Sequence, residues 1–194
     1  MKILEEKIAL CGKIGEGDVL KVDNFLNHQI DVPFLRLLGE EFYERYKDCA
    51  VNKILTIEAS GIGIACLAAQ FFNCPVVFAK KSKTSNLSGD VYASKVFSYT
   101  HQVTSDVIVN KAFLHPEDRI LIIDDFLANG QALLALRSLC EQAGATVVGA
   151  GIVIEKAYQP GGKLLRESGL RIESLARIAA MSPSDGFTFL PDGR

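Results

Sequence analysis

The sequence predicts an α/β domain with a central, mostly parallel sheet that helices cover on both faces. Two observations lead to this prediction. Residues 120–123 are four consecutive aliphatic residues, which is typical of a strand buried on both sides. Strand-like and helix-like segments also alternate along most of the chain, and this alternation favours parallel strands joined by helical crossovers. With 194 residues, the chain is long enough for one domain with a sizeable core.

The individual elements follow from the spacing of apolar residues. Helical spacing predicts helices over residues 3–10, 33–46, 62–72 and 130–143, and a shorter helix over 162–167. Alternating or continuous apolar residues predict strands over 18–22, 53–57, 76–79, 120–123, 146–154 and 171–176.

One long segment interrupts this alternation. Residues 80–109 are polar, with weak two-residue periodicity over 91–98 and 103–109. Connections of this length inside a compact domain are uncommon unless they are functional. We therefore expect a mobile antiparallel hairpin that acts as a lid; a disordered insertion is the alternative.

Composition excludes several classes of function. The chain has 21 basic and 23 acidic residues, which gives a net charge of −2. Its overall electrostatic field therefore does not attract nucleic acid or an anionic membrane. No segment is apolar enough to span a membrane, and residues 1–6 lack the apolar core of a signal peptide. The five scattered cysteines lack metal-ligand spacing, so we expect buried, reduced thiols in a cytoplasmic protein. They are Cys11, Cys49, Cys66, Cys74 and Cys140.

The segment after residues 120–123 carries the strongest chemical signal. Asp124 and Asp125 end the predicted strand, and residues 128–132 open the next helix. Ligands of parallel sheets bind where strands end and helices begin, and the free N–H groups of a helix start favour phosphate. Ionised carboxylates only accept hydrogen bonds, which suits the hydroxyls of a ribose. The pattern indicates a sugar-phosphate site; the alternative is a solvated strand end.

This segment resembles the phosphoribosyl pyrophosphate (PRPP) signature of the type I phosphoribosyltransferases. The resemblance implies the fold of that family in a single domain of residues 1–194, with a hood over about 1–35 and a flexible lid over about 80–109. It assigns Asp124 and Asp125 to the ribose hydroxyls as catalytic residues. It assigns the 5′-phosphate to a loop made of Ala128, Asn129, Gly130, Gln131 and Ala132.

A second loop follows the strand at residues 53–57. Glu58, Ala59, Ser60 and Gly61 resemble the pyrophosphate loop of the adenine and xanthine members of the family. The resemblance implies that this loop binds PRPP through backbone N–H groups and contains a non-proline cis peptide near Ala59–Ser60. A dinucleotide-binding fingerprint is the alternative, but Cys66 occupies the place of its third glycine.

Lys80, Lys81 and Lys83 lie where the lid is expected to begin, and a solvated strand end is the alternative interpretation. The resemblance assigns Lys81 to catalysis and PRPP binding, as a pyrophosphate ligand in its own subunit or in a neighbour's. No general base is evident, because Ser98 and Ala128 stand where other family members carry a glutamate or an aspartate. Our hypothesis is that the base attacks the ribose as its anion and so needs no general base. Xanthine, the most acidic of the common purines, would suit this mechanism.

Base recognition is expected from two segments. Lys156 ends the strand predicted over 146–154, and its ammonium can donate to a 6-oxo group but not to the amino group of adenine. An exposed strand-end lysine is the alternative. Residues 20–31 resemble the hood of bacterial xanthine phosphoribosyltransferases, which assigns Leu20 and Asn27 to the base; for His28, catalytic and structural roles both remain open.

The resemblance implies an enzyme of purine salvage that transfers the phosphoribosyl group of PRPP to xanthine and releases pyrophosphate. It further implies a homodimer and Mg²⁺ bound mainly through PRPP rather than by a protein metal site. Two alternatives remain. One is a phosphoribosyltransferase that prefers hypoxanthine or guanine, which share the 6-oxo group. The other is a PRPP-sensing transcriptional regulator, although no basic DNA-reading helix is visible before residue 53.

Overall fold

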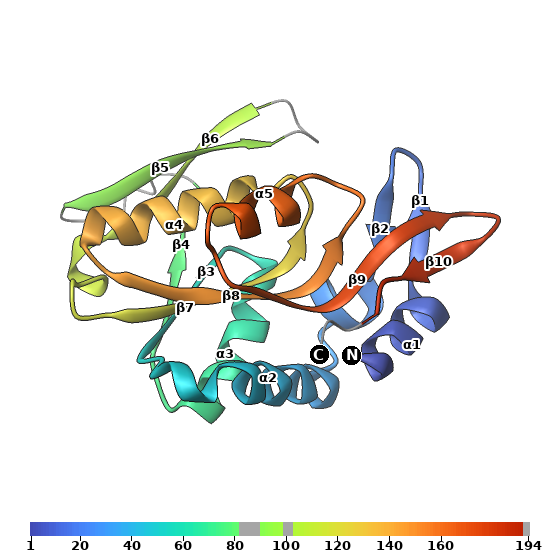
Figure 1. The fold of residues 1–194 in the computed structure, drawn as a ribbon, viewed down its shortest axis with the longest axis horizontal. Coiled ribbons are helices and arrows are strands. Elements are labelled where there is room, and N and C mark those ends of the chain that lie inside the picture. The colour runs from blue at the N-terminus through green and yellow to red at the C-terminus, as the bar shows by residue number, and fades with distance from the viewer. Residues whose placement is uncertain (82–89, 99–102, 192–194) are drawn as a thin grey trace.

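The structure is a computed structural model that describes residues 1–81, 90–98 and 103–191. A six-stranded sheet with the order β10-β9-β8-β7-β3-β4 forms its centre (Figure 1). Neighbouring strands from β9 to β4 are parallel, and only β10 is antiparallel to its neighbour. The strands are β3 (Lys53–Ile57), β4 (Val76–Ala79), β7 (Arg119–Leu127), β8 (Thr146–Lys156), β9 (Ile172–Ser182) and β10 (Gly186–Phe189).

Helices cover both faces of this sheet, as the sequence predicted. On one face lie α1 (Lys2–Cys11), α2 (Val32–Tyr46) and α3 (Ser60–Phe72); on the other lie α4 (Gln131–Ala143) and α5 (Gly161–Glu167) (Figure 1). Side chains of β7 alternate between the two hydrophobic clusters, with Leu121 and Ile123 in one and Ile120 and Ile122 in the other. This double burial accounts for the continuous aliphatic run.

The predicted antiparallel hairpin is present. It consists of β5 (Val91–Ser98) and β6 (Val103–Asn110), and its base packs against α4. Val107 and Val109 are buried there, and the side chain of Gln142 exchanges hydrogen bonds with the backbone of Ala93. Residues 82–89 and 99–102 of the predicted lid lie outside the described residues. Movement of the hairpin as a lid stays a prediction.

The hood is built from α1, the short strands β1 (Lys13–Gly15) and β2 (Val19–Lys21), and a π-helical turn (Asp23–Asn27). The strand predicted over 18–22 is therefore too long, since Asp18 lies in the turn between β1 and β2 with a φ of 66°. Strands β1 and β10 were not predicted, because each is short and half-exposed. None of the helices among the described residues is long and apolar enough to cross a membrane.

The expectation that all cysteines are buried is wrong. All five are free thiols, but only Cys140 is buried and Cys66 is exposed. The apolar neighbours of Cys66 in sequence face inward from α3, and Cys66 occupies the opposite side of that helix. Neighbours along a helix do not share its faces, so local composition misplaced this residue.

Candidate active site

Two adjacent carboxylates lie near the carboxyl end of β7. Asp124 is only 4% exposed, Asp125 is half-buried, and the Asp125 N–H donates to Oδ1 of Asp124 over 3.0 Å. Burial raises the pKa of the Asp124 carboxyl well above its usual value, the charge of Asp125 raises it further, and Lys81 opposes both effects. The expected strand end is wrong by a few residues, because β7 continues to Leu127 and both carboxylates belong to the strand.

The loop after β3 lies against this carboxylate pair. A Cβ atom on Gly61 would stand 3.4 Å from Oδ1 of Asp124 and 2.1 Å from the buried hydroxyl oxygen of Thr56. Only a glycine therefore fits at this point, and its small size brings the backbone of residues 58–61 beside the acidic pair. The peptide bond between Glu58 and Ala59 is cis, one bond before the predicted place.

The predicted lysine is attached to the same loop. The backbone N–H of Lys81, just beyond β4, donates to Oε1 of Glu58 over 2.6 Å. Lys80 precedes it and pairs with Ile108 of the hairpin through two backbone hydrogen bonds of 3.0 and 2.9 Å. The structure thus brings together the predicted pyrophosphate loop, Lys81 and the base of the hairpin.

The predicted phosphate loop joins β7 to α4. Gly130 has a φ of 80°, in the left-handed region that favours glycine, and it precedes the first residue of α4. The backbone carbonyl of Ala128 accepts a hydrogen bond of 3.0 Å from the N–H of Gly161 in α5. The N–H groups at the start of α4 are therefore placed for an anion at the same sheet edge as Asp124 and Asp125.

At the end of β8, the structure adds a contact that the sequence did not reveal. The ammonium of Lys156 donates to the backbone carbonyl of Asp18 and lies 4.0 Å from its carboxylate. That carboxylate also accepts hydrogen bonds from the hydroxyl of Tyr158 (2.7 Å) and the amide of Gln159 (2.9 Å). Burial lowers the pKa of Lys156, and the charge of Asp18 opposes this shift. We call this set of contacts the hood clasp.

The two predicted hood residues differ in their surroundings. Leu20, in β2, is 6% exposed and belongs to the hydrophobic core cluster on the α2 side of the sheet. Asn27 ends the π-helical turn, and its Oδ1 atom is buried without a hydrogen-bond partner among the described residues. A buried acceptor without a donor is unfavourable by about 1–3 kcal/mol, so this atom is a candidate ligand contact. His28 beside it is exposed.

Comparison with known proteins identifies the family. The family described as "Phosphoribosyl transferase domain" matches residues 31–167. A xanthine phosphoribosyltransferase of Lachnoclostridium phytofermentans is 54% identical over 186 residues, 96% of either chain. One of Bacillus cereus is 52% identical over 190 residues, 98% of this chain and 96% of its own. The chain belongs to the phosphoribosyltransferase family.

Solved structures agree with this membership at the level of the fold. The adenine phosphoribosyltransferase of Giardia lamblia, complexed with 9-deazaadenine, superposes with a TM-score of 0.77 at 24% identity, covering 91% of this chain and 98% of its own. The adenine phosphoribosyltransferase of Trypanosoma brucei superposes with a TM-score of 0.77 at 20% identity, covering 98% of this chain and 86% of its own. The predicted type I phosphoribosyltransferase fold is confirmed.

Some residues of this phosphoribosyltransferase site escaped the sequence analysis. Thr56 is completely buried, and its hydroxyl oxygen has no hydrogen-bond partner among the described residues. Asp18, Tyr158 and Gly161 reach the site through contacts with segments distant in sequence. A turn signal at residues 16–18 could have placed Asp18 in a turn. Nothing local to that turn indicates its partners at the end of β8.

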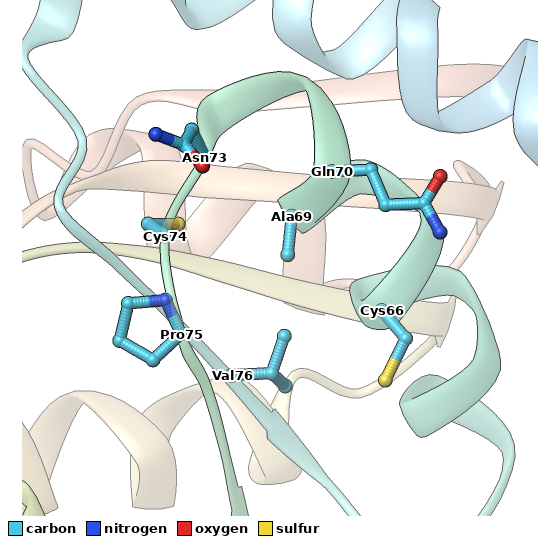
Figure 2. A pocket seen from close by; sticks show the side chains of 7 residues that line it. All are labelled: Cys66, Ala69, Gln70, Asn73, Cys74, Pro75 and Val76. Atoms are coloured by element: carbon cyan, nitrogen blue, oxygen red, sulfur yellow. The ribbon is translucent and has the colours of Figure 1, made fainter.

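A cavity elsewhere in the molecule belongs to a different region. It has a volume of about 510 Å³ and lies where α3 ends and β4 begins (Figure 2). Its lining includes Cys66, Gln70 and Asn73 from α3 and the turn after it, together with Pro75 and Val76. These residues lie at the amino end of β4, whereas the acidic pair lies toward the carboxyl end of β7. The cavity is therefore not part of the candidate active site.

Proposed function

We propose that this phosphoribosyltransferase transfers the 5-phosphoribosyl group of PRPP to xanthine, yielding xanthosine 5′-monophosphate and pyrophosphate. The observation that carries the proposal is the convergence of two backbone loops on the acidic pair, with Oδ1 of Asp124 only 3.4 Å from the Cβ position of Gly61. The choice of xanthine is supported by relatives at 52–54% identity that carry this name.

The acidic pair is proposed to bind the ribose. Asp124 and Asp125 would accept hydrogen bonds from the 2′ and 3′ hydroxyls, since ionised carboxylates offer only acceptors. Positive charge develops on the ribose as pyrophosphate leaves, and nearby carboxylates stabilise that charge. The developing cation would also favour the ionised form of Asp124, whose pKa is raised by burial and by Asp125.

The leaving pyrophosphate is proposed to lie between the loop of residues 58–61 and Lys81. Backbone N–H groups of that loop would donate to its oxygens, and the Lys81 ammonium would neutralise part of its charge. The link between Lys81 and Glu58 supports this arrangement, because it holds the lysine backbone beside the loop. The 5′-phosphate would bind the N–H groups of residues 128–132 at the start of α4.

Mg²⁺ is proposed to enter with PRPP. Among the residues that the structure describes, no group of three or more histidine, cysteine or acidic side chains could hold a metal ion. The oxygen donors of Asp124 and Asp125 suit a hard cation, but two carboxylates alone leave most of its coordination to phosphate oxygens and water. The ion would supply further charge neutralisation on pyrophosphate.

Xanthine is proposed to bind between the hood and the end of β8. Lys156 would donate to the 6-oxo group and Asn27 would contact the edge that carries the 2-oxo group, with Leu20 as an apolar neighbour. The unpaired, buried Oδ1 of Asn27 supports this role, because an N–H of the base would supply its missing donor.

A homodimer in the cytoplasm is proposed for the complete enzyme. β4 is the outermost strand of the sheet, and Phe78 on that strand is 41% exposed. A second copy packing there would cover this ring and the strand edge, which has no sheet partner among the residues that the structure describes. Light scattering after size-exclusion chromatography tests the mass, and Phe78→Glu should shift it toward the monomer. The five free thiols are compatible with a reducing compartment.

The function is tested by steady-state assays with PRPP and Mg²⁺. We expect the highest kcat/KM for xanthine among xanthine, guanine, hypoxanthine, adenine and uracil. A preference for guanine or hypoxanthine would retain the chemistry and reject the proposed role of Asn27. Absence of turnover with every base, together with tight PRPP binding, would favour a PRPP-sensing protein.

A further inference from the structure

The 5′-phosphate loop rests on the first residue of α5. Gly161 donates its N–H to the carbonyl of Ala128 over 3.0 Å. A Cβ atom on Gly161 would lie 2.4 Å from that carbonyl oxygen, and 2.5 Å from both the carbonyl carbon of Asn129 and the nitrogen of Gly130. All three atoms are backbone, so no side chain can rotate away to make room.

The need for glycine at this point is a matter of space. Gly161 does not adopt a φ in the left-handed region, so its backbone conformation is open to any residue. The contact is close from the other side as well: a Cβ on Gly130 would lie 3.2 Å from Cα of Gly161 and 2.9 Å from a methyl carbon of Leu165. The loop and the start of α5 are therefore packed backbone against backbone.

An ion pair with a buried carboxylate holds α5 in this position. Both oxygens of Glu155, which is 2% exposed, accept hydrogen bonds of 2.7 Å from the guanidinium of Arg166. The hydroxyl of Ser174 donates to the same carboxylate over 2.5 Å. Bidentate pairs of this kind fix orientation as well as distance. Glu155 and Ser174 lie on β8 and β9, so α5 is anchored to the sheet that also carries the acidic pair.

From these contacts we infer that Gly161 is a positioning residue for the 5′-phosphate loop. It touches no substrate itself; it acts by letting α5 approach the backbone of residues 128–130 so closely that only one loop conformation fits. A side chain at residue 161 displaces that backbone and misplaces the phosphate-binding N–H groups. The inference rests on the proposed function, because it concerns how the loop is held for PRPP.

The test compares Gly161→Ala with the wild type in two measurements. In steady-state assays with xanthine, PRPP and Mg²⁺, we expect KM for PRPP to rise at least about tenfold, since displacements near 1 Å cost up to about 10²-fold. KM for xanthine should stay within about twofold. In thermal unfolding, PRPP and Mg²⁺ should raise the midpoint less for the variant than for the wild type. Leu164→Ala, on the exposed side of α5, is the control and should change neither quantity.

The outcomes separate this inference from the proposed function. An unchanged KM for PRPP with an unchanged ligand-induced midpoint shift, or an equal rise of both KM values, would overturn the role of Gly161. If the wild type converts no base, the proposed function fails, but the midpoint shifts still decide the inference.

If Gly161→Ala does not fold, Leu165→Met replaces it, because this volume-conserving change moves the methyl group against Gly130 at little cost in stability. It should raise KM for PRPP about threefold; no rise would overturn the inference.

Discussion

The two halves of the active site are built in different ways. The proposed ribose and phosphate half lies at the ends of adjacent central strands. There Gly61 packs against the side-chain oxygens of Thr56 and Asp124, and Gly161 of α5 packs against the backbone of the loop after β7. The base half joins the hood to the end of β8 through side-chain contacts, chiefly those of Asp18. Close packing around the two glycines leaves little freedom, whereas a set of partly exposed polar contacts such as the hood clasp can open. We therefore expect substitutions in the first half to affect chemistry and PRPP binding, and those in the second to affect base selection.

The largest effect is expected from the acidic pair. Asp125→Asn replaces a carboxylate acceptor with an amide that also donates, so the ribose hydroxyls and the developing positive charge lose their partner. We expect kcat/KM to fall on the order of 10²–10³-fold, the range found when one preorganised electrostatic contact is removed. Steady-state kinetics with both substrates measures this loss. Asp48→Asn, an exposed control, should leave kcat/KM unchanged. A loss below threefold in Asp125→Asn would remove the acidic pair from the mechanism.

A smaller, selective effect is expected from the hood. Asn27→Ala removes the buried amide, and the ratio of kcat/KM for xanthine to that for hypoxanthine should fall about tenfold, within the range for one lost buried hydrogen bond. KM for PRPP should stay the same. Asn24→Ala is the matched control, because Asn24 belongs to the same π-helical turn but is exposed. Equal losses for both bases would reject Asn27 as the residue that distinguishes position 2.

The same contrast explains what the sequence could predict. The parallel strands, the covering helices and both strand-to-helix loops were predictable, because each depends on a local pattern. The roles of Asp124 and Asp125 stay predictions, and the end of β7 was misplaced, since nothing in residues 124–127 signals that pairing with β8 continues through Asp124, Phe126 and Leu127.

What escaped prediction depends on contacts between distant segments. Asp18 meets Tyr158 and Gln159, which lie 140 and 141 residues further along the chain. Gly161 is required only because the loop of residues 128–130 packs against it. The residues of the turn that carries Asp18 contain no information about the end of β8. Strand β10 was missed for a related reason. It forms by pairing with the far end of β9, and its own residues carry no strong strand pattern.

A smaller effect, on KM for xanthine, is expected from the hood clasp. In the structure, the ammonium of Lys156 donates to the backbone carbonyl of Asp18, so we expect the proposed contact with the base to compete with this one. When the clasp is open in only a fraction of the molecules, the apparent affinity for the base falls in proportion to that fraction. Asp18→Ala keeps the backbone carbonyl but removes the carboxylate that lies 4.0 Å from Lys156 and holds Tyr158 and Gln159, which loosens the turn around Lys156. KM for xanthine should therefore fall about two- to fivefold while KM for PRPP stays the same. Glu16→Ala, in the same turn, is the control. A higher KM for xanthine would show instead that Asp18 orients Lys156 for the base.

The smallest expected effect concerns stability, and it tests whether the ribose half is built for chemistry at a cost to folding. Because the pKa of Asp124 is raised in the folded state, the folded protein binds a proton that the unfolded chain releases near pH 4. Wild-type stability therefore falls as pH rises above that value, and Asp124→Asn escapes this loss.

We expect the amide variant, although inactive, to unfold about 2–4 °C higher at pH 8, as for about 1 kcal/mol in a domain of this length. The difference should be smaller at pH 4.5, which is closer to the pH at which the carboxyl of the unfolded chain titrates. Calorimetry at both values measures the shift, with Asp48→Asn as the control. A variant less stable than the wild type at pH 8 would mean that the Asp124 carboxylate supports the fold rather than burdening it.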